Sequence, residues 1–363
     1  MSRYFCETKT DASRDFTKLQ AVSDNHKKMK EKKPIDRKRE SSGHFDVGSM
    51  EDGAIVEMKN IGGKLLIIKE RAIYEVVFAD KIDPDRTNID LPPTFQKLII
   101  NKGSESETVS RTLLTALTLF KKEYILKTID CDKVIGLVIE LLSEISILEK
   151  EISEYLAEEK KAIDEYEERK RQNLSYELPS IINLESKCKT IFHKADQVEQ
   201  TLMEIITLFY PNDGLTKQSH FPAFYNVLKT KYGETDLFAE FIGKTVHFME
   251  VVRELRNGFE HRLKHTLVLN FELQTNGNVL TPTIELNHKK IKLQRTSLSE
   301  FLEITIKNLI DITEVTLAYL ASKNNKRHGI PNEVREIPED KRRNRFVKYS
   351  FWLPFGKEGF YVQ

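Results

Sequence analysis

The sequence predicts a mainly α-helical protein, a helical bundle with a long antiparallel helical hairpin, plus small antiparallel β elements near residues 54–80 and 266–294. Two observations predict this class. Apolar residues recur at alternating spacings of four and three along two long stretches, which is typical of helices that bury one seam. Short β-rich runs lie outside these stretches, with the turn signals Gly62-Gly63 and Asn276-Gly277 beside them.

The first segment, residues 1–50, has the composition of a basic flexible arm. Between Lys27 and Arg39 it carries eight basic residues against two acidic ones, with few apolar anchors. Such a run is typical of a solvated tail, and it would equally suit a polybasic contact with RNA or DNA. Both interpretations stay open.

Residues 51–130 predict a small α+β region. Three β-rich runs between Ala54 and Asp80 predict an antiparallel meander. The stretch with Pro84, Pro92 and Pro93 predicts a boundary, because proline continues neither a strand nor a helix. A helical pattern follows over about residues 104–127.

Residues 131–210 predict the long helical hairpin. The first seam consists of Val134, Val138, Leu141, Ile145, Leu148, Ile152 and Tyr155. The second consists of Ile181, Leu184, Cys188, Ile191, Ala195, Val198, Leu202, Ile205 and Phe209. Because only a short break containing Pro179 separates them, we expect an antiparallel pair that packs on itself, with a dimerising coiled coil as the alternative.

In residues 211–323 the pattern predicts two shorter helices, over about 222–231 and 236–262. Strands with a hairpin at Asn276-Gly277 follow. A last helix is predicted from Ser297 to about Lys323. Residues 324–363 form a basic and aromatic tail. Its aromatic residues are numerous enough to dock on the body as an edge strand, and we expect docking.

Composition excludes several classes of protein. The 57 basic and 56 acidic residues give a net charge of +1, so nucleic acid must be met by local patches. The three cysteines, Cys6, Cys131 and Cys188, show no CxxC spacing and predict reduced thiols. With no apolar run long enough to span a bilayer and no signal-peptide plan, we expect a cytoplasmic protein without a membrane partner.

The strong catalytic motifs are missing from the sequence. It contains no GxxxxGK[ST], GxGxxG, HExxH or GxSxG, and no paired metal-ligand spacing. We therefore expect no nucleotide-driven, dehydrogenase, zinc-protease or serine-hydrolase chemistry, and neither a cofactor nor a metal.

One helix end concentrates polar groups. Arg256, Asn257 and His261 close the predicted helix, and Asn257 and His261 share one row, while Arg256 and Glu260 share the neighbouring row. The plain alternative is a surface helix end, where Arg256 and Glu260 form an exposed ion pair and His261 meets the carboxyl terminus.

The run Arg256-Asn257-x3-His261 resembles the R-[N/D/H]-x3-H signature of the HEPN superfamily, whose helical domains often cleave RNA. The resemblance covers about residues 179–323, with the strands between Leu267 and Leu293 as an insertion, so the HEPN-like domain at 211–323 would share its bundle with 179–210. It implies a metal-independent endoribonuclease, a homodimer with a composite site, and a role in bacterial stress, toxicity or anti-phage defence. The looser R-x4-H pattern also occurs at Arg39 and His44.

These residue types suit cleavage by the RNA's own 2′-OH. An imidazole titrates near neutrality, so His261 would move the proton, and Arg256 would stabilise charge on the phosphorane. Asn257 would orient the imidazole or hold a phosphate oxygen. Further phosphate contacts would come from Arg253, Lys341, Arg342, Arg343 and Arg345. An acidic partner on the second helix would be Glu185, Glu199 or Glu204, with none favoured.

Two other functions are compatible with the sequence. One is a non-catalytic scaffold or interaction protein whose coiled-coil hairpin mediates assembly. The other is nucleic-acid binding through the basic arm and tail alone. A regulatory protein partner would fit a toxic nuclease.

Overall fold

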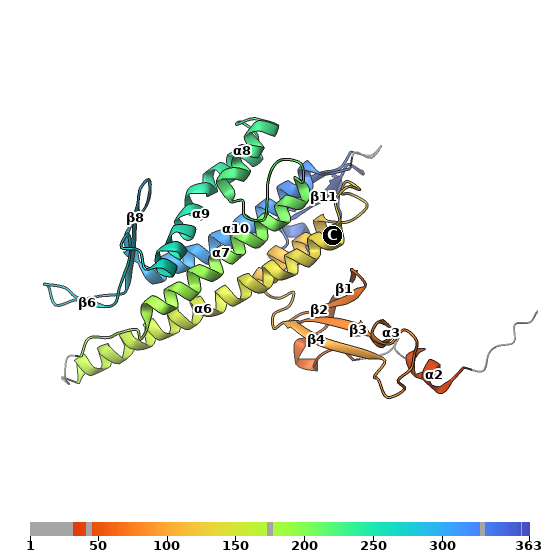
Figure 1. Ribbon diagram of the computed structural model, residues 1–363, viewed down its shortest axis with the longest axis horizontal. Coiled ribbons are helices and arrows are strands. Elements are labelled where there is room, and N and C mark those ends of the chain that lie inside the picture. The colour runs from red at the N-terminus through yellow and green to blue at the C-terminus, as the bar shows by residue number, and fades with distance from the viewer. Residues whose placement is uncertain (1–31, 41–45, 173–176, 327–330, 357) are drawn as a thin grey trace, which may run out of the picture. The chain divides into compact units, whose positions relative to one another are not determined.

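The computed structural model describes residues 32–40, 46–172, 177–326, 331–356 and 358–363 (Figure 1). It is mainly helical with several small antiparallel sheets, which confirms the predicted class. The chain divides into two compact units, one of Met1–Asp46 with Val76–Gln96 and one of Val47–Glu75 with Lys97–Gln363.

The longer helices are α6 (Cys131–Arg171), α7 (Leu184–Phe209), α8 (Phe221–Tyr232), α9 (Leu237–His261) and α10 (Leu298–Lys323). The shorter ones are α2 (Pro34–Glu40), α3 (Ala79–Ile82), α4 (Glu107–Val109) and α5 (Thr115–Leu119), with a π-helical turn at Ser110–Leu114 and 3-10 turns at Met50–Asp52 and Glu339–Lys341. The strands are β1 (Ile55–Ile61), β2 (Lys64–Lys69), β3 (Ile73–Phe78), β4 (Thr94–Ile100), β5 (Thr266–Leu269), β6 (Glu272–Leu273), β7 (Val279–Leu280), β8 (Thr283–His288), β9 (Ile291–Ser297), β10 (Glu333–Glu336), β11 (Tyr349–Leu353) and β12 (Phe360–Tyr361).

Helices α6 and α7 form the predicted antiparallel hairpin (Figure 1). Lys194 of α7 pairs with Glu144 and Lys187 with Glu158, so the two helices run in opposite directions. Every residue of both predicted seams is buried. Because one chain buries its own seams, the hairpin leaves no heptad seam open for a dimerising coiled coil.

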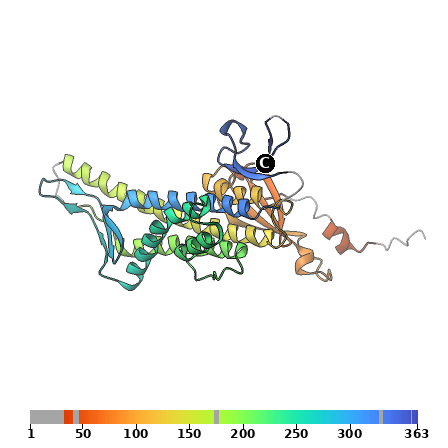
Figure 2. The ribbon, with the colours of Figure 1, turned by 90° about the horizontal axis from the view of Figure 1, so that it is seen from above.

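Helices α9 and α10 complete the bundle, and α10 runs alongside the hairpin in both views (Figures 1 and 2). Phe192 of α7 stacks on Phe259 of α9 at 5.6 Å and packs against Phe301 of α10 at 6.1 Å between ring centroids. The predicted cap of α10 is present, since the Ser297 hydroxyl accepts from the Glu300 amide at 3.4 Å. These contacts fix the carboxyl end of α9 against two other helices.

The predicted antiparallel strands after α9 are confirmed. Strands β5, β8 and β9 pair in that order, and β6 and β7 form a separate hairpin. Gly277 adopts a φ of 83°, as the predicted turn requires.

The amino-terminal sheet has four strands in the order β1-β2-β3-β4. The predicted meander corresponds to β1, β2 and β3, and the stretch with Pro84, Pro92 and Pro93 lies between α3 and β4 and contains neither a helix nor a strand, as predicted. Strand β4, which follows this stretch, was not predicted. Strand β4 begins at Thr94, directly after the second proline of the pair, because proline excludes a strand only where it stands. The helical pattern predicted over 104–127 ends earlier, with α5 at Leu119.

Part of the predicted arm is packed. Residues 1–31 and 41–45 lie outside the described residues, but α2 is a helix whose Arg39 is only 3% exposed. Arg39 Nη2 lies 3.0 Å from Asp83 Oδ2 in the same unit. This guanidinium is therefore engaged within the fold, which argues against a free tail at Arg39.

The aromatic tail docks on the body, as predicted, and its last strand, β12, is an edge strand of a three-stranded sheet. Strand β11 is the middle strand of the β10-β11-β12 sheet. Its Phe351 is buried and stacks on Tyr124 at 4.8 Å. The cluster of buried apolar residues runs from Leu66 to Phe351, so the predicted segments 51–130, 131–210, 211–323 and 324–363 share one core. No helix in the described ranges is long and apolar enough to cross a membrane.

Candidate functional site

The motif residues lie in the last turns of α9. Leu255 and Phe259 anchor this end of the helix in the core, and the polar residues occupy its other side. Arg256 Nη1 donates a hydrogen bond of 2.9 Å to Asn257 Oδ1, and both side chains are half-buried. The structure thus joins two of the three predicted catalytic residues directly.

Helix α7 supplies an acid that the sequence did not single out. Asp196 is 2% exposed, its Oδ2 lies 3.6 Å from Arg256 Nε, and Gln200 donates to the same oxygen at 2.6 Å. The guanidinium is therefore held from two sides, by a carboxylate on α7 and by an amide on its own helix. At 3.6 Å this contact is an ion pair and not a hydrogen bond, since Arg256 Nε is buried and has no hydrogen-bond partner among the described residues.

The three acids considered from sequence occupy other places. Glu199 is buried and lies 3.4 Å from the Phe221 amide, Glu204 pairs with Lys217, and Glu185 is exposed. Asp196 follows the seam residue Ala195, and only the helix pairing of α7 with α9 brings it to Arg256. No local signal marks it.

His261 is the last residue of α9 and is exposed. It follows Asn257 by one helical turn, so the two share a row as predicted. In the described ranges no hydrogen bond or ion pair engages its ring, which leaves the imidazole accessible to a ligand.

The plain surface alternative does not form as expected. Glu260 pairs with Lys189 of α7 at 3.1 Å, while the ion pair of Arg256 is with Asp196. The hydrogen bond from Lys189 lowers the pKa of the Glu260 carboxyl, with smaller contributions from the nearby charges of Arg256 and His193. His193 is thus a second imidazole near the motif, and no sequence pattern marks it.

The chain reverses immediately after the motif. Arg262 adopts a left-handed φ of 52°, and the amides of Arg262 and Leu263 both donate to the Gly258 carbonyl, the latter at 2.9 Å. A Cβ added at Gly258 would overlap the Thr266 side chain. Gly258 therefore lets β5 approach α9 closely and fixes where the helix ends.

The other predicted RNA-binding residues are placed elsewhere or are engaged. Arg253 lies beside the motif, with its Nε 4.0 Å from Glu254 Oε1. Lys341 pairs with Glu358, Arg342 with Glu336, Arg343 donates to the Gln363 carbonyl and Arg345 lies over the Phe346 ring. These four residues lie in the segment between β10 and β11, and β11 lies near the opposite end of α10 from the carboxyl end of α9 (Figure 1), so the structure does not bring them to Arg256.

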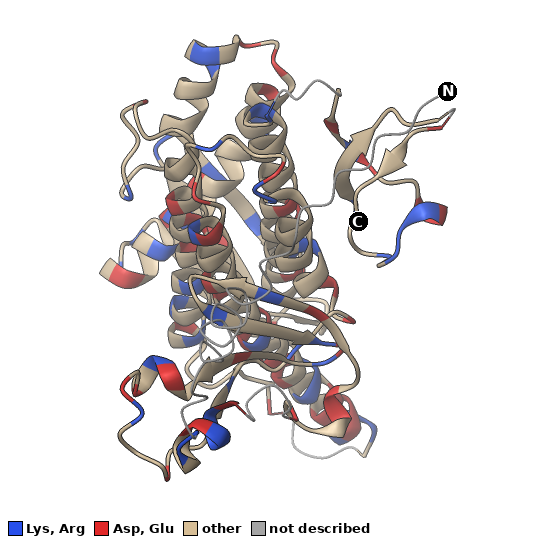
Figure 3. Ribbon diagram, turned by 90° about the vertical axis from the view of Figure 1, so that its right-hand side faces the viewer, with Lys and Arg blue, Asp and Glu red and all other residues tan. Residues whose placement is uncertain are grey.

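Charge is mixed over the molecule. Figure 3 shows Lys and Arg interspersed with Asp and Glu along the helices. This distribution agrees with the net charge of +1 and makes any nucleic-acid contact a local one.

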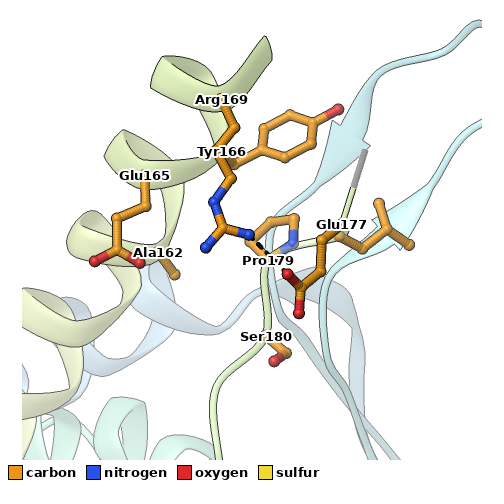
Figure 4. Close-up of a pocket in the computed structure, with 8 residues that line it drawn as sticks. Ala162, Glu165, Tyr166, Arg169, Glu177, Pro179 and Ser180 are labelled. Carbon is orange, nitrogen blue, oxygen red and sulfur yellow. Dashed lines mark hydrogen bonds and ion pairs between the residues drawn. The ribbon is translucent and has the colours of Figure 1, made fainter. Parts of the chain in front are cut away.

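A small pocket of about 140 Å³ lies near the tip of the hairpin (Figure 4). Its one ion pair among the residues drawn joins Arg169 to Glu177 at 2.7 Å, and Tyr166 and Pro179 line it as well. The arginine is thus already neutralised, and the pocket offers no convergent set of catalytic groups.

One further cluster was not foreseen. Glu254, His265 and His288 place one potential metal-ligand atom each within 4.8 Å of the others. No metal was expected, because the sequence contains no paired metal-ligand spacing. Only the packing of α9 against β5 and β8 brings them together.

No protein-family model matches the chain, and comparisons with curated proteins and with solved structures find no match. The function is therefore inferred from the site alone.

Proposed function

We propose that the protein is a metal-independent endoribonuclease of HEPN type whose site is Arg256, Asn257 and His261. The observation that carries the proposal is the arrangement at the carboxyl end of α9. There Arg256 is oriented by Asn257 and by the buried Asp196, beside an exposed imidazole one turn on.

The chemistry needs only these groups and the RNA. The 2′ oxygen bonds to the adjacent phosphorus while the bond from phosphorus to the 5′ oxygen breaks. His261 takes the 2′ proton, and the departing 5′ oxygen receives a proton from water or from a second imidazole. The products carry a 2′,3′-cyclic phosphate and a 5′-OH.

Arg256 stabilises the charge that grows on the phosphorane oxygens. Its guanidinium has a fixed planar set of donors that matches two phosphate oxygens. Asp196 Oδ2 lies near Nε and Asn257 Oδ1 accepts from Nη1, so Nη2, which no hydrogen bond engages among the described residues, is left to donate to a phosphate oxygen. Preorganised donors of this kind lower a barrier because they need no reorientation during the reaction.

The site is accessible and mixed in charge. Lys189 and Arg253 flank the motif on α7 and α9, while Glu260 and Asp196 offset part of their charge. A second copy of the same surface would double the number of cations and imidazoles facing one phosphate. A homodimer with a composite site is therefore part of the proposal, together with a cytoplasmic location and a role in stress, toxicity or anti-phage defence that a regulatory partner restrains.

The test is incubation of the purified chain with structured RNAs in excess EDTA. We expect cleavage by the parent and its loss in His261→Ala. The matched control is His247→Ala, because His247 is also an exposed histidine of α9 and stands about 21 Å along the helix from His261. Equal cleavage by both variants, or none by the parent, would refute the proposal.

The main alternative, a non-catalytic scaffold, makes a different prediction. Binding to a protein partner would survive both histidine variants, and RNA would stay intact. The buried seams of α6 and α7 argue against a scaffold that assembles through the hairpin. Their apolar side chains already pack against each other within one chain.

A further inference from the structure

The unforeseen cluster combines three segments that meet beside the motif. Glu254 belongs to α9, His265 lies between α9 and β5, and His288 ends β8. One ligand-type atom from each lies within 4.8 Å of the other two. Two imidazoles and one carboxylate are a common ligand set for zinc in proteins.

The backbone fixes these positions. The Asn287 amide donates to the His265 carbonyl at 2.9 Å, and β5 pairs with β8 from Thr266 opposite Leu286. This ladder places the two imidazoles side by side, with ring centroids 4.2 Å apart. Glu254 reaches them from the helix, with its Oε2 2.7 Å from His288 Nδ1.

One imidazole of the cluster has a ring nitrogen without a partner among the described residues. His265 Nε2 is buried and has no hydrogen-bond partner among the described residues. A buried nitrogen without a partner is unusual, because a lost hydrogen bond to water is not replaced. Glu254 is also well shielded, with 13% of its side chain exposed.

We propose that Glu254, His265 and His288 bind a zinc ion whose fourth position is open to water. Two nitrogen ligands and one oxygen ligand favour zinc over magnesium or calcium, which prefer oxygen alone. Binding exchanges the hydrogen bond between His288 and Glu254 for two metal bonds. It also turns the imidazoles out of their parallel stack, because a ring nitrogen coordinates in the plane of its ring.

The ion would link β5 and β8 to α9. Glu254 lies three residues before Asn257 and seven before His261, so all three share one stripe of the helix. A metal at Glu254 therefore stabilises β5 and β8 against the helix that carries the motif. None of its ligands is Arg256, Asn257 or His261, so the inference stands apart from the ribonuclease proposal.

The test uses the full chain without an affinity tag, stripped with EDTA and then given zinc sulfate. Metal retained after gel filtration is counted by mass spectrometry, and thermal unfolding is followed with and without zinc. We expect about one zinc per chain, a higher Tm with zinc, and no response to magnesium.

Two ligand variants and two controls make the result specific. His288→Ala and Glu254→Gln should each weaken zinc binding by at least about tenfold, and Glu254→Gln keeps the shape of the side chain. His247→Ala and His261→Ala should bind zinc as the parent does. A parent that retains no zinc at micromolar free metal, or ligand variants that bind as well as the parent, would overturn the proposal.

Discussion

At the scale of single residues, the orientation of the Arg256 guanidinium depends on its partner Asp196. The Arg256 side chain is 29% exposed, while its partner Asp196 is almost fully buried. A buried carboxylate needs a cation or hydrogen-bond donors, and Arg256 and Gln200 supply them.

The change Asp196→Asn removes the charge and keeps the shape. We expect the free energy of unfolding to fall by about 1–3 kcal/mol, since hydrogen bonds to charged groups contribute this much. RNA cleavage should also fall, because the guanidinium loses its orienting partner. Urea unfolding measures the first effect, and Asp164→Asn, at an exposed position of α6, should change it by less than about 0.5 kcal/mol.

Two glycines within helices predict opposite effects of the same change. Gly258→Ala places a methyl group against Thr266 and should destabilise the protein by about 1–3 kcal/mol. Gly136→Ala meets nothing within 4 Å and should stabilise it by about 0.4–1 kcal/mol, because alanine favours the helix. Thermal unfolding of the two variants side by side tests this, and equal shifts would contradict the close approach of β5 to α9.

Elements differ in how well the sequence predicts them. The heptad seams predicted α6 and α7 because a spacing of four and three is a property of one helix alone, visible before any packing. Strand β4 was missed because Pro92 and Pro93 dominate the local pattern, although the strand starts directly after them. Strand β11 was predicted to dock, but its central position depends on β10 and β12, which are short and carry little pattern.

The candidate site divides in the same way. Arg256, Asn257 and His261 are close in sequence, so helical periodicity alone put them on one end of α9. Asp196, and the group of Glu254, His265 and His288, come together only through tertiary packing. A single sequence contains no local signal for such distant partners.

Asp83, in the loop after α3, makes the stability of this element depend on pH. Hydrogen bonds from the backbone amides of Thr87 and Asn88 lower the pKa of Asp83 to about 2, and the charge of Arg39 adds to this. Because the folded pKa is depressed, the contribution of Asp83 to stability is complete above its ordinary value of about 4 and is lost as pH falls toward 2. A carbon-13 titration of the side-chain carboxyl, assigned with Asp83→Asn, measures this, and a midpoint near 4 would contradict it.

At the scale of the whole molecule, the proposed composite site needs a second copy of the chain. The near-neutral total charge gives no general attraction for RNA, so affinity must come from cations gathered at one place. Two copies meeting at the carboxyl ends of α9 would gather Arg256, Lys189 and Arg253 from each chain. We expect a dimer by sedimentation equilibrium at concentrations where RNA is cleaved, in the parent and in His261→Ala alike. A monomer that cleaves RNA would contradict the composite site.

In the proposed reaction the RNA's own 2′-OH cleaves the chain. His261 takes the proton and Arg256 stabilises the charge on the phosphorane. The most direct measurement is the mass of the product ends from a defined RNA cleaved in EDTA, beside the same RNA with a 2′-deoxy residue at the cut position. We expect 2′,3′-cyclic phosphate and 5′-OH ends, and no cut at the deoxy position. Products with 3′-OH and 5′-phosphate ends, or unchanged cutting at the deoxy position, would contradict it.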